Sequence, residues 1–80
     1  MIITDGTHLV STVSETELHE FAIGMGLNRR WYQRHPRHPH YDLTTKQAVV
    51  RALKFGAAMV TAPYLLRNAW WALGITKGGE

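Results

Sequence analysis

The sequence predicts a small α/β domain of β-α-β-α-β-α order, with a three-stranded, mostly parallel sheet. Two observations support this fold class: β-rich apolar runs alternate with helical patterns, and capping residues or glycines bound the helical patterns. Strands that alternate with helices favour parallel pairing through right-handed crossovers. A winged-helix-like or α+β arrangement is the alternative. We assign residues 1–75 to this single domain and expect residues 76–80 to form a flexible C-terminal tail.

The first expected strand is Ile2–Thr4, a β-rich run that Asp5 and Gly6 interrupt as a turn pair. The next segment, His8–Ser11, either continues this strand or forms a packed loop.

The first expected helix follows a capping box, in which Ser14 and Glu17 satisfy each other's backbone N–H groups. Apolar residues then recur at helical spacing, so the helix is expected over residues 15–25. Gly26 supplies the left-handed residue that stops it.

Residues 27–33 are expected to form the second strand, and residues 34–42 a loop. Pro36 and Pro39 lie in that second stretch. Each proline removes a backbone donor and pushes its predecessor toward extended geometry, which is typical of a loop.

The second expected helix starts at another capping box, formed by Thr44 and Gln47, and ends at Gly56. Its inward face is expected to carry Ala48, Val49, Ala52, Leu53 and Phe55. The compact apolar run at residues 57–61 is expected to be a buried third strand.

The third expected helix begins near Pro63 and runs to about Leu73. Apolar side chains lie nearly all round it, including Leu66, Trp70 and Trp71, and one small sheet cannot bury every side. Paired tryptophans are common interface anchors. We therefore expect a homodimer through this helix, with burial inside one chain as the alternative.

Composition narrows the class of partner. The 80-residue chain has 45% hydrophobic and 19% charged residues, which is a globular composition, and a formal charge of +3. This basic balance favours anionic partners such as nucleic acid or nucleotides. No targeting segment and no apolar stretch of about 20 residues is visible, so no membrane contact is expected. The absence of cysteine excludes thiolate metal sites and fits the cytoplasm of a bacterial host.

The segment from His35 to Asp42 is the strongest candidate site, because His35, His38, His40 and Asp42 fall within eight positions. His38 and His40 are two residues apart, so on an extended chain they point to one face. Imidazole and carboxylate groups suit divalent metals, although the spacing matches no standard zinc motif. Metal binding, contact with a phosphate group, and a purely structural loop all remain open from these residues.

The expected topology favours the phosphate interpretation. In an open parallel sheet, ligands bind beyond the carboxyl ends of the strands. Asp5, His8 and the histidine loop would meet at that edge, together with the starts of the second and third helices, whose free N–H groups favour anions. Arg34 and Arg37 would add positive charge.

Several segments resemble a small family of unknown function found in bacteria and phages, DUF4031. The similar segments are the Asp-bearing first strand with residues 8–10 (HLV), then 17–22 (ELHEFA), 26–27 (GL), 30–33 (RWYQ), 40–44 (HYDLT) and 56–57 (GA). They cover most of residues 2–61, and the His-Tyr-Asp run is the most specific. The chain departs from the pattern at Asp5-Gly6, where relatives are expected to carry a second acidic residue. The resemblance implies a bacterial or phage origin and no mechanism.

The leading hypothesis is a binding protein that recognises a phosphate-bearing ligand, a nucleotide or nucleic acid, through the basic histidine-rich loop. The expected ligand-binding residues are His8, Arg34, His35, Arg37, His38, His40, Tyr41 and Asp42. Arg29 and Arg30 would add positive field. Trp31 beside these arginines either stacks on a single-stranded base or, as we favour, lies in the core of a strand.

Two alternatives come from other classes. One is a metal-dependent hydrolase or nuclease that binds zinc, manganese or nickel. Its expected metal ligands are Asp5, His38, His40 and Asp42, and His8 completes the cluster. The other is a protein–protein inhibitor or assembly subunit that acts through Leu66, Trp70 and Trp71. No G-x-S-x-G, P-loop or cysteine nucleophile is present, so we favour binding over catalysis.

Overall fold

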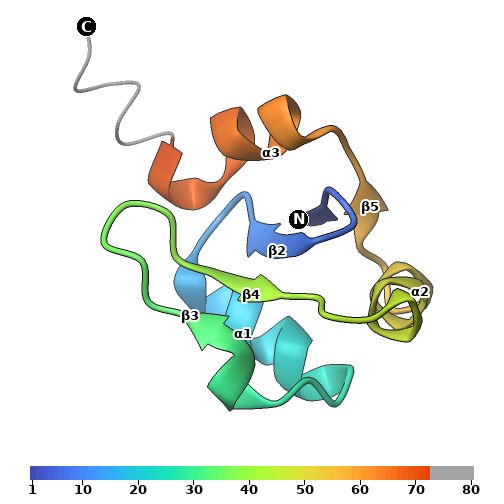
Figure 1. Cartoon of the computed structure of the whole chain (residues 1–80). Helices are drawn as coiled ribbons and strands as arrows, with labels where there is room; N and C mark the ends of the chain where they lie inside the picture. The colour runs from blue at the N-terminus through green and yellow to red at the C-terminus, as the bar shows by residue number, and fades with distance from the viewer. Residues whose placement is uncertain (73–80) are drawn as a thin grey trace, which may run out of the picture.

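Five short strands form one mixed sheet in the computed structural model, which describes residues 1–72 (Figure 1). The elements in chain order are β1 (Ile2–Thr4), β2 (His8–Ser11), α1 (Glu15–Gly24), the 3₁₀ helix η1 (Arg29–Trp31), β3 (Tyr32–Gln33), β4 (His40–Asp42), α2 (Lys46–Lys54), β5 (Ala58–Met59) and α3 (Ala62–Asn68). The expected tail at residues 76–80, and the last three residues of the expected domain, lie outside the described part of the chain.

The prediction of a three-stranded, mostly parallel sheet is wrong. The strand order is β3-β4-β2-β1-β5, and only β1 and β5 run parallel. The β1–β2, β2–β4 and β3–β4 pairs are all antiparallel. The predicted β-α-β-α-β-α order is also wrong, because no helix separates β1 from β2 or β3 from β4, and these consecutive strands pair as antiparallel neighbours.

The turn between β1 and β2 explains why these strands are antiparallel and not parallel as predicted. The Asp5 Oδ1 atom accepts hydrogen bonds from the backbone N–H groups of Thr7 (2.9 Å) and His8 (2.8 Å), which forms an Asx turn. Gly6 has a φ of 93°, a value that glycine adopts without steric cost. The chain therefore reverses, and His8–Ser11 pairs back on β1 as a hairpin, with Ile3 opposite Val10.

Strand β4 lies in the segment that was predicted to be a loop because it contains Pro36 and Pro39. Residues 34–39 form the expected loop, but His40–Asp42 is strand β4. Both prolines precede it, so its backbone donors are free, and it pairs with β2 in a register that places Asp42 opposite His8. The expected strand at 27–33 is also wrong, because Asn28 caps the η1 turn with its side chain and leaves only Tyr32 and Gln33 to pair.

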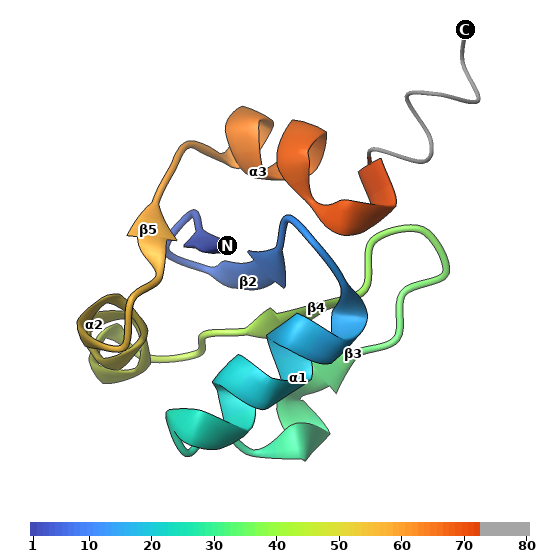
Figure 2. The same cartoon turned by 180° about the vertical axis from the view of Figure 1, so that it is seen from behind.

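Alternating side chains of the sheet enter two separate cores. One face packs against α1 and α2, and its buried residues include Leu9, Leu18 and Tyr41. The opposite face packs against α3, where Ile3, Val10 and Leu65 meet. Figures 1 and 2 show α3 on one side of the sheet and α1 on the other. On β4, Tyr41 enters the first core, so His40 and Asp42 face α3.

The helix boundaries follow local signals closely. Ser14 caps α1 and Gly26, with a φ of 81°, follows its end, as predicted. The cap of α2 is Thr45 and not Thr44: its hydroxyl accepts from the Ala48 N–H at 3.1 Å.

The other half of the first capping box is absent. The Glu17 carboxylate binds the Ser11 hydroxyl, and Ser11 accepts from the N–H of Ser14.

Two features of the helices differ from prediction: the exposure of residues near the end of α2 and the length of α3. Leu53 and Phe55 were expected to face inward on α2, yet they are 37% and 54% exposed. The third helix ends at Asn68, because Ala69 adopts an extended ψ of 152°. Within residues 1–72, no helix has the length and apolar character needed to cross a bilayer.

Candidate functional site: a histidine cavity between the sheet and α3

A cavity of about 230 Å³ lies where the face of β2 and β4 meets α3. Four of the five histidines of the chain line or enter it: His8, His35, His38 and His40. Asp5 contributes a carboxylate, while α3 and the segment after it contribute an apolar wall of Ala62, Leu65, Leu66 and Trp71. The cavity therefore combines metal-ligating groups with an apolar side.

The turn residue Asp5 holds the imidazole of His8. The Asp5 Oδ2 atom lies 3.0 Å from His8 Nδ1, and the Asp5 side chain is 9% exposed. Burial raises the pKa of Asp5, but the hydrogen bonds from His8 and Thr7 outweigh it and hold the pKa below its usual value. An ionised carboxylate only accepts hydrogen bonds, so a proton lies on His8 Nδ1, and in the neutral imidazole the lone pair is on Nε2.

His40 is held in the same tautomer by a different acceptor. Its Nδ1 lies 2.6 Å from the backbone oxygen of His38, which also only accepts. Its Nε2 lies 3.0 Å from Asp42 Oδ1. Because a neutral His40 would carry its proton on Nδ1, two acceptors would then face each other across those 3.0 Å. A positive species, either a second proton on the ring or a metal ion, is needed between them.

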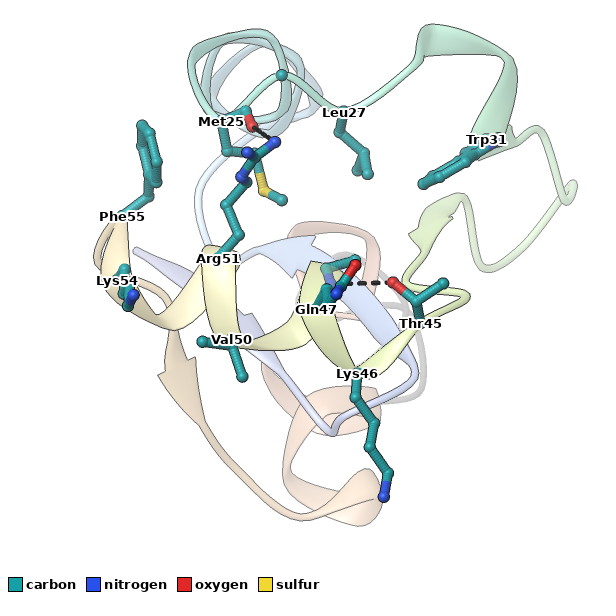
Figure 3. Close-up of a pocket in the computed structure, with 12 residues that line it drawn as sticks. Met25, Leu27, Trp31, Thr45, Lys46, Gln47, Val50, Arg51, Lys54 and Phe55 are labelled. Atoms are coloured by element: carbon teal, nitrogen blue, oxygen red, sulfur yellow. Dashed lines mark hydrogen bonds between the residues drawn. The ribbon is translucent and has the colours of Figure 1, made fainter.

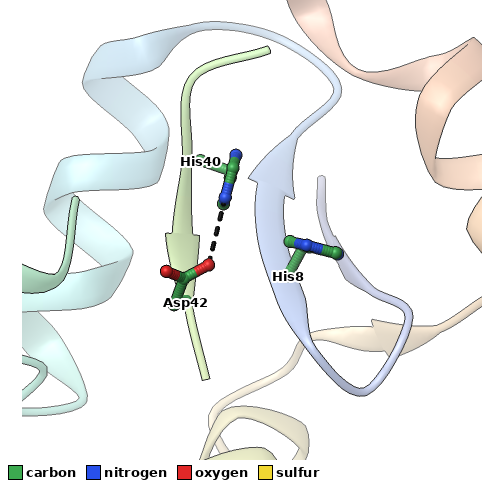
Figure 4. Close-up of side chains that lie close together, drawn as sticks. All are labelled: His8, His40 and Asp42. Atoms are coloured by element: carbon green, nitrogen blue, oxygen red, sulfur yellow. Dashed lines mark hydrogen bonds and ion pairs between the residues drawn. The ribbon is translucent and has the colours of Figure 1, made fainter. Parts of the chain in front are cut away.

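His8, His40 and Asp42 bring one ligand atom each to within 4.8 Å of one another, and no other such group of three is found among residues 1–72 (Figure 4). The register of β2 and β4 explains this proximity, since His8 lies opposite Asp42, and the rings of His8 and His40 meet edge to face at 4.8 Å. All three side chains are partly accessible. The arrangement offers three ligands and an open side toward the cavity, as catalytic zinc sites do.

The other two histidines form the outer wall of the cavity. The rings of His35 and His38 stack at 5.1 Å, and His38 meets the edge of Trp71 at 4.8 Å. The Trp71 indole N–H donates to the backbone oxygen of Pro39 at 2.9 Å, which connects the histidine loop to the segment after α3. His35 Nδ1 accepts from two backbone N–H groups, those of Arg37 and His38, at 3.1 Å each.

Not every predicted site residue reaches this cavity. Arg34 and Arg37 are exposed and do not line it. Tyr41 is fully buried on the opposite face, where its hydroxyl pairs with His19 Nδ1 at 2.8 Å. The start of α2 lines a different pocket. The charged groups that favoured a phosphate in the sequence are thus not gathered at the histidines.

The predicted interface residues are partly used inside the chain. Trp70 packs against both cores, and Trp71 is engaged by the histidine loop. Leu66 is 50% exposed and lines the cavity.

Sequence reasoning missed a polar network on the other face of the sheet. His19 on α1 lies against Tyr32 and Tyr41, and Arg29 approaches its Nε2 at 3.3 Å. The Tyr32 hydroxyl donates to the Glu15 carboxylate. Burial and the charges of Arg29 and Arg34 lower the pKa of His19 and outweigh the negative charge of Glu15, which raises it, while burial raises the pKa of Tyr41. The i, i+4 spacing of Glu15 and His19 was the available signal.

A family model described as "Protein of unknown function (DUF4031)" matches residues 4–70, so the chain belongs to that family. No curated protein and no solved structure matches the chain.

Proposed function

We propose that this DUF4031 protein is a metal-dependent hydrolase of phosphate esters, which holds one divalent ion, zinc or manganese, on His8, His40 and Asp42. The observation that supports it is the paired tautomer: Asp5 holds Nδ1 of His8, and the backbone oxygen of His38 holds Nδ1 of His40. In the neutral imidazoles both Nε2 atoms then carry the lone pair, and a metal ion would satisfy the two acceptors, His40 Nε2 and Asp42 Oδ1, that face each other at 3.0 Å. Such outer-shell acceptors are characteristic of metal-binding histidines.

The ligand atoms need only a small movement to bind one ion. With metal–ligand bonds of about 2 Å, ligand atoms lie roughly 3 to 3.5 Å apart in a tetrahedral site. His40 Nε2 and Asp42 Oδ1 already satisfy this at 3.0 Å, so the closing movement falls on His8. Its side chain is 39% exposed and has room to move.

A bound divalent ion would attract a phosphate-bearing substrate to this site more directly than the arginines of the loop would. Arg34 and Arg37 stay outside the cavity, whereas a divalent ion would supply positive charge at its floor. The formal charge of +3 favours an anionic substrate over a neutral one. We retain nucleotide or nucleic-acid fragments as the substrate class.

The remaining histidines have distinct roles in the proposed reaction. His38 has no hydrogen bond to its ring nitrogens from the described residues, so its ring would be available to exchange a proton at this site. A divalent ion held by His8, His40 and Asp42 would supply a Lewis acid that activates water for attack on phosphorus. His38 would accept the proton of that water and return it to the leaving oxygen as the bond from phosphorus to that oxygen breaks. His35, which accepts at Nδ1, has its proton on Nε2 and can donate to a phosphoryl oxygen.

Metal titration with matched variants tests the proposal. Chelator-treated protein should bind zinc or manganese by calorimetry, and the loaded protein should hydrolyse an activated aryl phosphodiester. His8→Gln and Asp42→Asn should abolish both, whereas His19→Gln, a histidine outside the cavity, should retain both. Absence of metal binding at micromolar concentration would overturn the site, and metal binding without turnover, with nucleotide retained, would replace hydrolysis by ligand binding.

We also propose a source, a cellular location and an oligomeric state for the protein. We propose a bacterial or phage origin and action in the host cytoplasm, on the family resemblance and the cysteine-free sequence. A homodimer through the exposed side of α3, at Leu66, is also proposed. The inhibitor hypothesis receives less support, because both tryptophans of this region pack within the chain.

A further inference from the structure

A second pocket, of about 600 Å³, lies between the end of α1, η1 and the length of α2 (Figure 3). Its residues are distinct from those of the histidine cavity. Figure 3 shows Trp31 and Phe55 at opposite ends of it, with Leu27 and Arg51 between them. We call this pocket the α2 groove.

The exposed apolar surface of the α2 groove comes from its two aromatic rings, Trp31 and Phe55, and from Val50, which is 50% exposed. Trp31 is 37% exposed and Phe55 is 54% exposed, although both were expected in the core. The floor residues Met25 and Leu27 are only 3% and 9% exposed, so the chain itself already covers them. The groove thus offers two exposed aromatic rings at its ends above a floor that the chain itself already covers.

The charges along the α2 groove are all positive. Lys46, Arg51 and Lys54 line it, and no acidic side chain does. Arg51 reaches across the groove, where its guanidinium donates to the backbone oxygen of Met25 at 3.4 Å. Because a helix rises 1.5 Å per residue, Lys46 and Lys54 are about 12 Å apart along α2.

The sequence concentrates positive charge in the same region. All nine Lys and Arg residues follow residue 28, and Asp42 is the one acidic residue between positions 21 and 79. Asp42 lies beside His8 and His40, and no acidic residue lines the α2 groove. An anionic partner is therefore complementary to this face.

We propose that the α2 groove binds single-stranded nucleic acid, with one unpaired base stacked on Trp31, another on Phe55, and phosphates at Lys46, Arg51 and Lys54. Cations alternating with exposed aromatic rings are the usual means of binding single strands without sequence preference. An acidic amphipathic peptide would match the charge, but it would need an open apolar floor, and Met25 and Leu27 are already buried. This binding is independent of the metal site.

Fluorescence anisotropy with a labelled oligothymidine tests the inference on the full chain. Trp31→Ala and Phe55→Ala should each weaken binding roughly 5- to 150-fold, the range for loss of one stacked base. With three phosphate contacts, the logarithm of affinity should fall with the logarithm of salt at a slope of about −2, and the double variant Lys46→Gln/Lys54→Gln should reduce it to about −0.7. Duplex DNA of the same length should bind more weakly, because its bases are already stacked.

Matched controls separate this groove from general charge and from the metal site. Arg67→Gln removes one positive charge from α3 and should leave the oligonucleotide affinity of chelator-treated, metal-free protein within about twofold. Circular dichroism should show that each variant is folded. The inference is overturned if Trp31→Ala and Arg67→Gln have equal effects, if duplex binds as tightly as single strand, or if an acidic peptide binds and oligothymidine does not.

Discussion

Replacing Asp5 by asparagine should reverse the tautomer of His8 and weaken metal binding without disrupting the fold. The amide oxygen of asparagine can still accept from the N–H groups of Thr7 and His8, so the Asx turn persists. Its NH₂ group would occupy the place of Oδ2, 3.0 Å from His8 Nδ1. Since NH₂ donates and does not accept, the His8 proton should move to Nε2, the atom that we assign to the metal.

The expected loss is a factor of about 10 to 100 in metal affinity, the usual effect of removing an outer-shell partner, or about 1.4 to 2.8 kcal/mol. The metal-free protein should change much less. The pair is partly exposed at His8, and the exchanged hydrogen bond is replaced, so we expect less than about 1 kcal/mol in the free energy of unfolding.

Two measurements check this prediction together. Nitrogen-15 spectra of the histidine side chains report which ring nitrogen of His8 is protonated, and calorimetry with zinc reports the affinity. Asp5→Glu serves as a control for charge without the turn geometry and should lose stability. An Asp5→Asn protein that keeps both the Nδ1–H tautomer and the original affinity would refute the proposed role of Asp5.

Three further predictions test the fold around the site. Thr45→Ala should cost about 1 kcal/mol in unfolding free energy through the lost α2 cap, and Thr44→Ala should cost almost nothing; equal costs in urea melts would contradict the cap assignment. The pKa of His19 in the folded protein lies below 6.5, so the unfolded chain takes up a proton first as the pH falls. The free energy of unfolding should therefore keep the His19 contribution above pH 6.5 and lose it as the pH drops below that value. Urea melts of His19→Gln should show a weaker pH dependence over that range, and an unchanged dependence would exclude His19. Trp71→Phe removes the hydrogen bond to Pro39, so amide hydrogen exchange in the loop at residues 34–39 should accelerate, with exchange in α1 as the unaffected reference.

The starts of the helices and the ends of α1 and α2 were predictable from the sequence because their determinants are local, whereas the end of α3 at Asn68 was not. The Ser14 hydroxyl caps a backbone N–H three residues away, and Gly26 and Gly56 take positive φ directly after the helices they end. The one-residue error at Thr44 and Thr45 also has a local cause, since either threonine offers the same hydroxyl.

The candidate site was only partly visible in the sequence. Nearness in sequence drew attention to the three loop histidines and Asp42. The alternation argument was applied to His38 and His40, whereas the strand β4 begins at His40, so the pair that shares a strand face is His40 and Asp42. The joining of His8 to this group depends on the pairing of β2 with β4, which no local pattern encodes.

The sequence by itself determined where the helices begin, where the first two end, the basic character of the chain, and the segment that carries three of its five imidazoles. Only the tertiary structure decided the direction of the strands, the face on which each histidine lies, and the exposure of Trp31. The physical reason is range: a cap or a glycine acts within about four residues, whereas strand order depends on burying both faces of the sheet with helices that are distant in sequence. Antiparallel hairpins and parallel crossovers can use the same strand residues, and the contacts of the packed chain select between them.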